Sequence, residues 1–329
     1  MKHALVLIFA VILVAVGAPR PAAGTAHVCS ACGEAIEGSF FETKGNYYHP
    51  HHFVCEYCSS PITGQYTTYR SRNYHHKCFE GHIALRCVLC RLPIDGEYLV
   101  DYWGNAYHKR HASEVPTCDF CDRLLSAELR EGGVRFSDGR SLCGDCHRSA
   151  VKKVRQARAL MNRVAAQLRR IGMDFETVDL RLHLIGLKRM QEIANFRSHD
   201  LRGFTDYHEE RNLFGRTSKR QIDVYLLYGM PKVEMIGTLA HELTHVWQFL
   251  SGRLDGDRAL SEGSCNFASY WVLKQMAPGR EADFIIESML RDEDEIYGEG
   301  FRRVKRYVER NGISRWLALM ADEGPGLPK

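Results

Sequence analysis

Apolar residues recur at helical spacing in the stretch VKKVRQARALMNRVAAQLRRIG, which covers residues 151–172. Lysines and arginines stand between them, so the pattern predicts an amphipathic helix that ends at Gly172 and has a basic, solvated face. Contact of that face with an acidic partner is the alternative. The apolar positions are Val154, Ala157, Met161, Val164, Ala165, Leu168 and Ile171.

Further elements are expected downstream of this helix. QIDVYLLYG predicts a strand over residues 222–228, and the apolar pattern after Pro231 predicts a long helix from about 232 to 250 that stops before Gly252. Another helix is predicted from about 258 to 276, and EADFIIESMLRDEDEIYG and FRRVKRYVERNG also have helical spacing. Residues 151–329 are therefore expected to form one mainly α (α+β) domain with its own core.

The N-terminus has a different pattern. Lys2 and His3 precede an apolar run over residues 4–16, followed by Pro19, Pro21 and small residues. This order is typical of a signal peptide over residues 1–26, cleaved after Gly24 or Ala26, and predicts an exported protein, periplasmic or secreted. An uncleaved membrane anchor is the alternative, although the run is shorter than the roughly 20 residues of a spanning helix.

The composition argues mainly against a nucleic-acid partner. The 329 residues include 44 basic and 40 acidic ones, a formal net charge of +4. Such a balance gives no electrostatic reason to expect a nucleic-acid partner. Protein partners or peptide substrates are expected instead.

Eleven of the twelve cysteines lie between Cys29 and Cys146 in a regular ladder with histidines. The first part reads C-x2-C-x16-H-x2-H-x2-C-x2-C-x16-H-x2-C. Disulfides would explain neither the register nor the histidines, whereas tetrahedral zinc takes two such pairs per ion. Sites closed by four ligands leave no position for substrate, so these zincs are expected to be structural.

The ladder resembles a LIM domain over residues 27–84, a pair of small β-hairpin fingers. In a LIM domain the first four ligands hold one zinc and the last four hold another. The resemblance implies one site at Cys29, Cys32, His49 and His52 and a second at Cys55, Cys58, His75 and Cys78. His52 stands where a cysteine is usual.

A related module is expected over residues 85–150, with a longer linker, ASEVPT, between its halves. We term it LIM-like. Four histidines beside the ligands (His51, His76, His82 and His147) are out of register and are expected at the surface, with exchange of His51 or His76 for a neighbouring ligand as the alternative. The module's predicted sites are Cys87, Cys90, His108 and His111, then Cys118, Cys121, Cys143 and Cys146.

A second kind of metal site is expected within the stretch TLAHELTHVWQF. His241 and His245 are four residues apart, so both lie on one face of the predicted helix, and Glu242 stands beside them. Glu262, on the next helix, is the candidate third ligand, and antiparallel packing would bring it over the histidines. The alternative is a helix with two histidines that bind no metal, because this short motif is frequent by chance.

Other residues near the motif are weaker candidates. Asn266, one turn after Glu262, is expected to orient a histidine ligand, with a surface amide as the alternative. Cys265 is not assigned to metal. The strand at 222–228 is expected to pair with extended substrate. Candidate oxyanion donors are Tyr225, Tyr228, His183 and His208, which the sequence does not rank.

The chain as a whole resembles the plant organ-size peptidases of the DA-one (DA1) family. The resemblance rests on YHPHHFVCEYCSSPI, LYGMPKVEMIGTLAHELTHVW and LSEGSCNF, and is most specific over residues 227–266. It implies a zincin-like zinc metallopeptidase that hydrolyses protein substrates. His241, His245 and Glu262 would bind the catalytic zinc, and Glu242 would be the general base.

The resemblance has limits that shape the expected function. The plant enzymes carry ubiquitin-interacting helices before their LIM module, whereas a signal-peptide pattern precedes Cys29 here. Ubiquitin dependence is therefore in doubt, and an exported bacterial relative is expected. The LIM fingers would dock substrates or regulate the enzyme. The alternative function is an exported LIM adaptor or scaffold whose peptidase-like domain is latent or inactive.

Overall fold

The computed structural model of the chain divides into two compact units, residues 1–116 and 117–329. It describes residues 3–7, 11–12, 27–43, 45–113, 115–125, 133–175, 179–211, 217–251 and 257–321. The division at Thr117 falls inside the LIM-like module, so the last cysteine cluster lies in the unit that also holds residues 241–245, which we call the HELTH motif.

Four tight turns with the same hydrogen bonds form the cysteine ladder, one at each C-x-x-C pair. In every turn the first cysteine accepts a bond from the amide four residues later, and that residue has positive φ. A positive φ at these positions closes the loop around the metal site. We call these turns knuckles 1 to 4. Their left-handed residues are Gly33, Ser59, Arg91 and Asp122.

Short antiparallel hairpins complete the fingers of the first unit. The pairs are β3 (Phe41–Thr43) with β4 (Asn46–Tyr48), β5 (Tyr66–Tyr69) with β6 (Arg72–His75), and β7 (Gly96–Val100) with β8 (Ala106–His108). Helical turns follow β6 and β8, namely α1 (His76–Cys78), η1 (Phe79–Ile83) and η2 (Lys109–Ser113).

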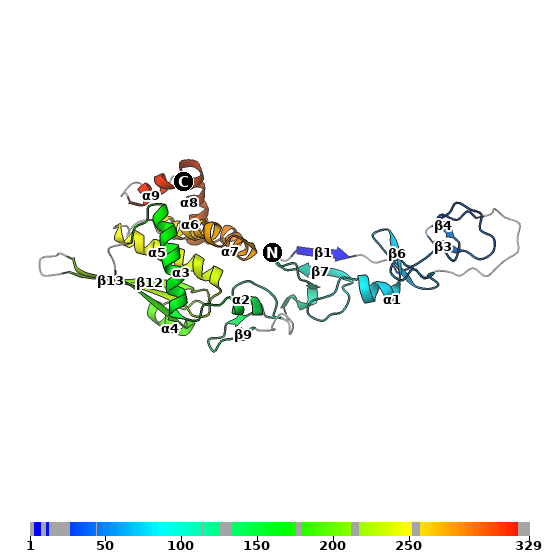
Figure 1. The fold of residues 1–329 in the computed structure, drawn as a ribbon, viewed down its shortest axis with the longest axis horizontal. Helices are drawn as coiled ribbons and strands as arrows, with labels where there is room; N and C mark the ends of the chain where they lie inside the picture. Colours follow the sequence, from blue (N-terminus) through cyan, green and yellow to red (C-terminus); the bar gives the residue numbers. More distant parts are fainter. Residues whose placement is uncertain are drawn as a thin grey trace. The chain divides into compact units, whose positions relative to one another are not determined.

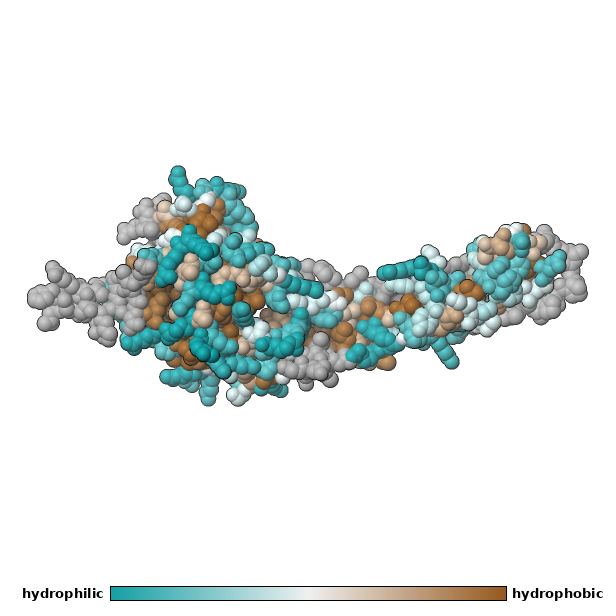
Figure 2. Space-filling view, in the orientation of Figure 1, coloured by the Kyte–Doolittle hydropathy of each residue, from teal (hydrophilic) through white to brown (hydrophobic). Residues whose placement is uncertain are grey.

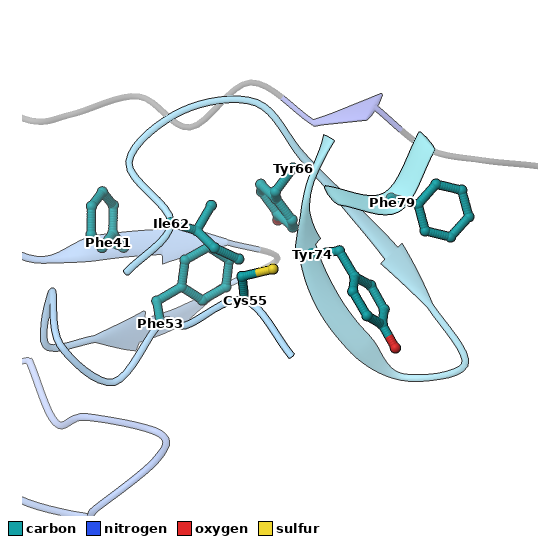
Figure 3. Packing of buried hydrophobic residues seen from close by; sticks show 7 residues of the cluster. All are labelled: Phe41, Phe53, Cys55, Ile62, Tyr66, Tyr74 and Phe79. Carbon is teal, nitrogen blue, oxygen red and sulfur yellow. The ribbon is translucent and has the colours of Figure 1, made fainter. Parts of the chain in front are cut away.

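A small aromatic core packs between the two fingers of the LIM module (Figure 3). Phe53 is its centre, with Tyr66 in edge-to-face contact at 5.0 Å between ring centroids. Such a core is too small to stabilise the fingers alone, which agrees with folding driven by metal. Its buried members are Phe41, Phe53, Cys55, Ile62, Tyr66, Tyr74 and Phe79.

Two strands come from the segment that the sequence predicts to be a signal peptide. β1 (His3–Leu7) pairs with β7 and β2 (Val11–Ile12) pairs with β5, both antiparallel. The signal peptide itself stays a prediction, as do the cleavage sites, which lie outside the described residues.

The second unit begins with the last finger and the amphipathic helix. The finger holds β9 (Val134–Arg135), β10 (Ser141–Leu142) and α2 (Gly144–Arg148). Helix α3 (Val154–Arg170) then follows, as its apolar spacing predicts. The expected apolar positions from Ala157 to Leu168 are buried, whereas Val154, at the first turn, is 43% exposed.

A three-stranded mixed sheet lies beside the HELTH helix. Its strands are β11 (Asp179–Ile185), β12 (Gly203–Arg211) and β13 (Thr217–Leu227), in the order β11-β13-β12. β13 contains the expected strand but is central, parallel to β11 and antiparallel to β12. The prediction that this strand pairs with substrate is therefore wrong, because both its edges are already hydrogen-bonded. Among the described strands, β12 pairs with β13 alone and is an edge strand of the sheet.

Helices cover both faces of this sheet (Figure 1). The helices α3, α5 (Lys232–Leu250) and α6 (Arg258–Met276) lie on one side of β12 and β13, and α4 (Leu187–Ala194) lies on the other. α5 and α6 have the bounds that the sequence predicts. Alternate β13 residues Ile222, Val224 and Leu226 are fully buried toward the helices.

The C-terminal helices close the unit around α6. They are α7 (Arg280–Arg291), the π-helical turn η3 (Glu295–Glu299), α8 (Gly300–Asn311) and α9 (Ile313–Ala321). Gly263 of α6 allows this packing, since a Cβ there would lie 2.3 Å from the Gly300 carbonyl carbon. The glycine after Glu262 thus lets the start of α8 pack directly against α6.

The surface has mixed polarity. On the face seen in Figure 2, hydrophilic and hydrophobic residues are interspersed. Among the described residues no helix combines the length and apolarity needed to cross a bilayer.

Candidate active site and structural metal sites

Helix α5 brings the two histidines of the HELTH motif together. His241 and His245 lie one turn apart, and their Nε2 atoms are 3.1 Å from each other. Both side chains are mostly buried, with 19% and 26% of their surface exposed. The two ring nitrogens thus point to one place beside the helix.

Glu262 of α6 reaches the same place. Its Oε2 atom lies 3.3 Å from Nε2 of His241 and 3.4 Å from Nε2 of His245. This oxygen is buried and accepts no hydrogen bond of ordinary geometry from any residue in the described part of the chain. Burial alone would raise the pKa of Glu262, but the two imidazoles hold that pKa well below its usual range. The anionic oxygen of Glu262 therefore faces two imidazole nitrogens but accepts no well-formed hydrogen bond from either.

These separations match a tetrahedral metal site. Nitrogen and oxygen ligands at about 2.0–2.1 Å from a tetrahedral zinc lie about 3.3–3.4 Å apart. The observed distances of 3.1, 3.3 and 3.4 Å are within a few tenths of an ångström of that value. Three ligands also leave one coordination position for water or substrate. The residues therefore fit a zinc ion with an open position.

Amide side chains fix the opposite edges of the two rings. Nδ1 of His241 donates to Oδ1 of Asn266 at 3.0 Å, the contact expected from the sequence. Nδ1 of His245 donates to Oε1 of Gln248 at 3.1 Å, a contact that the sequence analysis missed. Ser261 in turn donates to Gln248 at 2.9 Å. A proton held on each Nδ1 leaves each Nε2 lone pair free for metal.

Replacing Asn266 with alanine is expected to weaken metal binding at this site by roughly 10- to 100-fold, because the His241 ring loses its orienting acceptor. Competition with a zinc chelator measures the affinity, and Asn162→Ala on the exposed face of α3 is the matched control. Equal affinity in the two variants would remove the orienting role of Asn266.

Cys265 lies beside the cluster but on its other side. Its Sγ atom is 3.4 Å from Nδ1 of His245, so the thiol contacts the ring edge away from Glu262. Cys265 could complete a metal-binding group with the two histidines by distance alone. The thiol lies at the Nδ1 edge of His245, however, whereas the Nε2 atoms of both histidines face Oε2 of Glu262. Among these groups, Glu262 is the one whose side chain meets both Nε2 atoms.

Strand β12 determines where the Glu242 carboxylate lies. Thr205 donates its hydroxyl to Oε2 of Glu242 at 2.6 Å. Gly203 packs so closely that a Cβ at this position would be 2.6 Å from Oε1. Only 5% of Glu242 is exposed. The sequence analysis missed both β12 residues.

The structure does not bring the candidate oxyanion donors to the cluster. Thr205 pairs with Val224 and faces α5, so the next residue, Tyr225, faces the opposite side of the sheet. Tyr225 stacks there on His183, whose Nε2 donates to Asp223 at 2.6 Å. These placements correct the expectation for Tyr225 and His183.

The two remaining donor candidates also make other contacts. Tyr228 meets Phe136 of the last finger edge to face, and His208 pairs with Asp206 on β12. Tyr297, which the sequence does not single out, is 37% exposed and lies beside Asn266. Burial raises the pKa of Tyr297 on η3, and the nearby Glu262 raises it further. Asn266 also donates to the Tyr297 carbonyl at 3.1 Å.

The cysteine ladder forms four compact clusters of ligands. Each expected set of four comes together with its ligand atoms within 4.8 Å of one another. Sulfur and nitrogen ligands of one tetrahedral zinc are about 3.6 Å apart, and two sulfurs about 3.8 Å. The observed values are 3.4 Å for Cys29–His52, 3.6 Å for Cys32–His49, 3.3 Å for Cys58–His75, 3.4 Å for Cys90–His108 and 3.7 Å for Cys121–Cys143. These Cys/His clusters indicate zinc binding.

The hydrogen bonds that orient the histidine ligands are also repeated between clusters. His75 and His108 each bind with Nδ1 toward a cysteine and donate Nε2–H to a proline carbonyl, Pro61 or Pro93, at 3.1 Å. The four histidines expected to be out of register belong to none of the metal-binding groups of the described chain. His76, for example, bonds to Thr67, and His82 stacks on Tyr57.

Known family models match two separate parts of the chain. A LIM domain model matches residues 29–81, and the DA1-like family model, described as Protein DA1, matches residues 185–288. The second match includes β12, both histidines of the HELTH motif, and Glu262. The LIM match covers the first two cysteine clusters.

Several curated relatives align with most of the chain, and others with a part of it. Protein DA1 of Arabidopsis thaliana is 24% identical over 88% of this chain and 66% of its own length. The LIM domain-containing protein HDR3 of Oryza sativa is 22% identical over 88% of this chain and 72% of its own length. Human zyxin is 32% identical over only 37% of this chain. Because a LIM domain precedes a DA1-like domain, and because DA1 and DA1-related proteins align with most of the chain, the chain matches the DA1-like LIM family.

Proposed function

We propose that this protein is a zinc-dependent endopeptidase with a zincin-like catalytic domain. One observation carries the proposal. The buried Oε2 of Glu262 lies 3.3 and 3.4 Å from the Nε2 atoms of His241 and His245, yet it accepts no hydrogen bond of ordinary geometry in the described part of the chain. A helix pair that merely buries two histidines would satisfy that oxygen. Three converging ligands beside a glutamate are instead the requirement for metal-assisted hydrolysis.

The chemistry follows from the roles of the chain's own groups. Zinc in this site would polarise the scissile carbonyl and lower the pKa of a water molecule toward about 7. Glu242 accepts the proton of that water and then delivers it to the leaving amine. The hydroxyl of Thr205 holds Oε2 of Glu242, which leaves Oε1 for the water. The tight contact at Gly203 limits other positions of the carboxylate.

Substrate recognition is assigned to the free edge of β12. This strand is the edge strand nearest α5, and its Thr205 touches the catalytic glutamate. An extended peptide that hydrogen-bonds to the β12 edge would lie across the metal site, with main-chain contacts that tolerate many sequences. Tyr297, whose carbonyl accepts from Asn266 one turn after Glu262, is a nearer candidate oxyanion donor than Tyr225, which lies on the opposite face of the sheet.

The four cysteine clusters are assigned one structural zinc each, so a fully loaded chain would hold five ions. The LIM fingers would bind protein substrates or partners and regulate cleavage. Export through the N-terminal segment is part of the proposal. The competing function is an exported LIM adaptor with a silent peptidase-like domain.

Cleavage of casein by the zinc-loaded protein tests the proposal. Brief treatment with a chelator is expected to remove the ion from the three-ligand site before it removes the ions from the four-ligand sites, because the ion in the open site is held by fewer protein ligands. Activity should disappear as the first ion is lost and return when one equivalent of zinc is added. A protein that holds five zincs and leaves casein intact would support the adaptor instead.

A further inference from the structure

Knuckle 4, residues 118–122, packs against the machinery assigned to catalysis. Both belong to one compact unit. The segment after Cys146 pairs with the turn that leads into α5: Val151 donates to Met230 at 2.8 Å, and Lys232 donates to Ser149 at 3.0 Å. The last finger is therefore hydrogen-bonded to the start of the HELTH helix.

The finger's hairpin makes a second contact with the same turn. Phe136 lies over Gly229, where a Cβ would be 2.6 Å from the ring. Gly229 also has a φ of +80°, so a side chain is disfavoured there on two grounds. Asp138 of this hairpin accepts a hydrogen bond from the Leu187 amide at the start of α4, at 3.3 Å.

Arg202 makes the third contact, and it touches knuckle 4 itself. Its Nη2 donates to the Asp119 carbonyl at 2.7 Å, and its guanidinium lies 4.5 Å from the centroid of the Phe120 ring. Asp119 and Phe120 are the two residues between the ligands Cys118 and Cys121. The conformation of the metal-binding loop therefore decides whether these two contacts form.

The same side chain also reaches α5. Nε of Arg202 lies 3.6 Å from Oε1 of Glu234, in the first turn of the helix, and the two side chains are only 20% and 18% exposed. Burial raises the pKa of Glu234, and the charge of Arg202 opposes that rise. Loss of Arg202 would leave the buried carboxyl of Glu234 without its cation. The first turn of α5 would then be less stable in its present position.

The main chain carries these constraints to Glu242. Arg202 is bonded directly to Gly203, the residue that contacts the Glu242 carboxylate, and its own carbonyl accepts from Leu227 of β13 at 3.0 Å. Thr205, two residues further, donates to the same carboxylate. A shift at Arg202 therefore moves the two groups that define where Glu242 lies.

We propose that Arg202 is a positioning residue that links the metal-binding knuckle at Cys118–Cys121 to the Glu242 carboxylate. The proposal rests on the proposed peptidase function for its kinetic consequence, but the link itself is structural. With the knuckle formed, the guanidinium is held by Asp119, Phe120 and Glu234 at once. The fourth cluster then supports catalysis from a distance and touches no substrate.

Variants of Arg202 test the link, with Arg155→Gln on the exposed face of α3 as the matched control. Arg202→Gln is expected to keep its full zinc content and its KM within about twofold, but to lose tenfold or more in kcat, since small misplacements of catalytic groups cost about that much. Arg202→Lys, which keeps the charge beside Glu234, should recover part of the loss. Phe120→Leu should lower kcat in the same direction.

Hydrogen exchange supplies a readout that does not need activity. Amides of β12 and of the first turn of α5 are expected to exchange faster in Arg202→Gln and Phe120→Leu than in wild type, while α8 is unchanged. Unchanged exchange in β12, or a kcat equal to that of Arg155→Gln, would overturn the link. Inactive wild type with faster β12 exchange in the variants would refute the peptidase function and leave the structural link standing.

Discussion

Glu242→Gln is expected to lower kcat for peptide cleavage by roughly 10²- to 10⁴-fold, the usual contribution of a general base. Glutamine keeps the size of the side chain and can still accept the Thr205 hydroxyl, so the local packing around β12 should persist. It cannot take a proton from water. Metal analysis should find the same zinc content as in wild type, because Glu242 is not among the converging ligand atoms.

The informative control for this variant is a glutamate outside the site. Glu309→Gln on α8, where Glu309 pairs with Lys305 on the surface, should retain full activity. Comparable activity in Glu242→Gln and Glu309→Gln preparations, both purified free of contaminating proteases, would falsify the catalytic assignment.

His245→Ala is expected to remove one zinc ion, from five to four per chain, together with activity. The remaining pair, His241 and Glu262, would bind zinc far more weakly than three ligands do. Partial occupancy should therefore disappear after dialysis against a mild chelator. The four cysteine clusters share no ligand with this site, so their zinc should remain.

His208→Ala provides the comparison, because His208 lies on β12 and pairs with Asp206. It should keep five zincs and most of its activity. If His245→Ala also retained five ions, the fifth ion would have to bind elsewhere. The HELTH motif would then be a structural feature of α5 that binds no metal, since so short a motif also occurs by chance.

Elements with strong periodicity were predictable from the sequence. The bounds of α5 and α6 follow from continuous apolar patterns, and four-residue spacing placed His241 and His245 on one face. Asn266 was found in the same way, one turn after Glu262. Gln248 lies three residues after His245, on the same face of α5, and a search along this helix for side-chain acceptors would have found it.

The part of the site on β12 was not predictable. GFTDYHEER has few buried apolar residues, and its inward positions near α5 are the small Gly203 and the polar Thr205. Tyr225 was misassigned for a related reason. The sequence shows that β13 has two faces, but only the order β11-β13-β12 and the packing of α5 decide which face meets the metal site.

The domain boundary of the fourth cluster also depends on contacts that sequence spacing does not contain. Spacing grouped Cys118–Cys146 with the fingers before it, whereas compactness groups these residues with α5. The decisive contacts, such as Phe136 with Gly229, join a finger to a turn almost a hundred residues later in the chain. The boundaries of the LIM and peptidase domains otherwise stay predictions.

The four knuckles have a consequence for the order of assembly. Each closes with hydrogen bonds between residues four or five apart, whereas Arg202 meets Asp119 across 83 residues and Leu187 meets Asp138 across 49. Local loops close much faster than long ones, because little chain entropy is lost. We therefore expect a newly made chain to close its knuckles early and to complete the surroundings of Glu242 last. The fingers would then hold their metal ions before the proposed catalytic site is assembled.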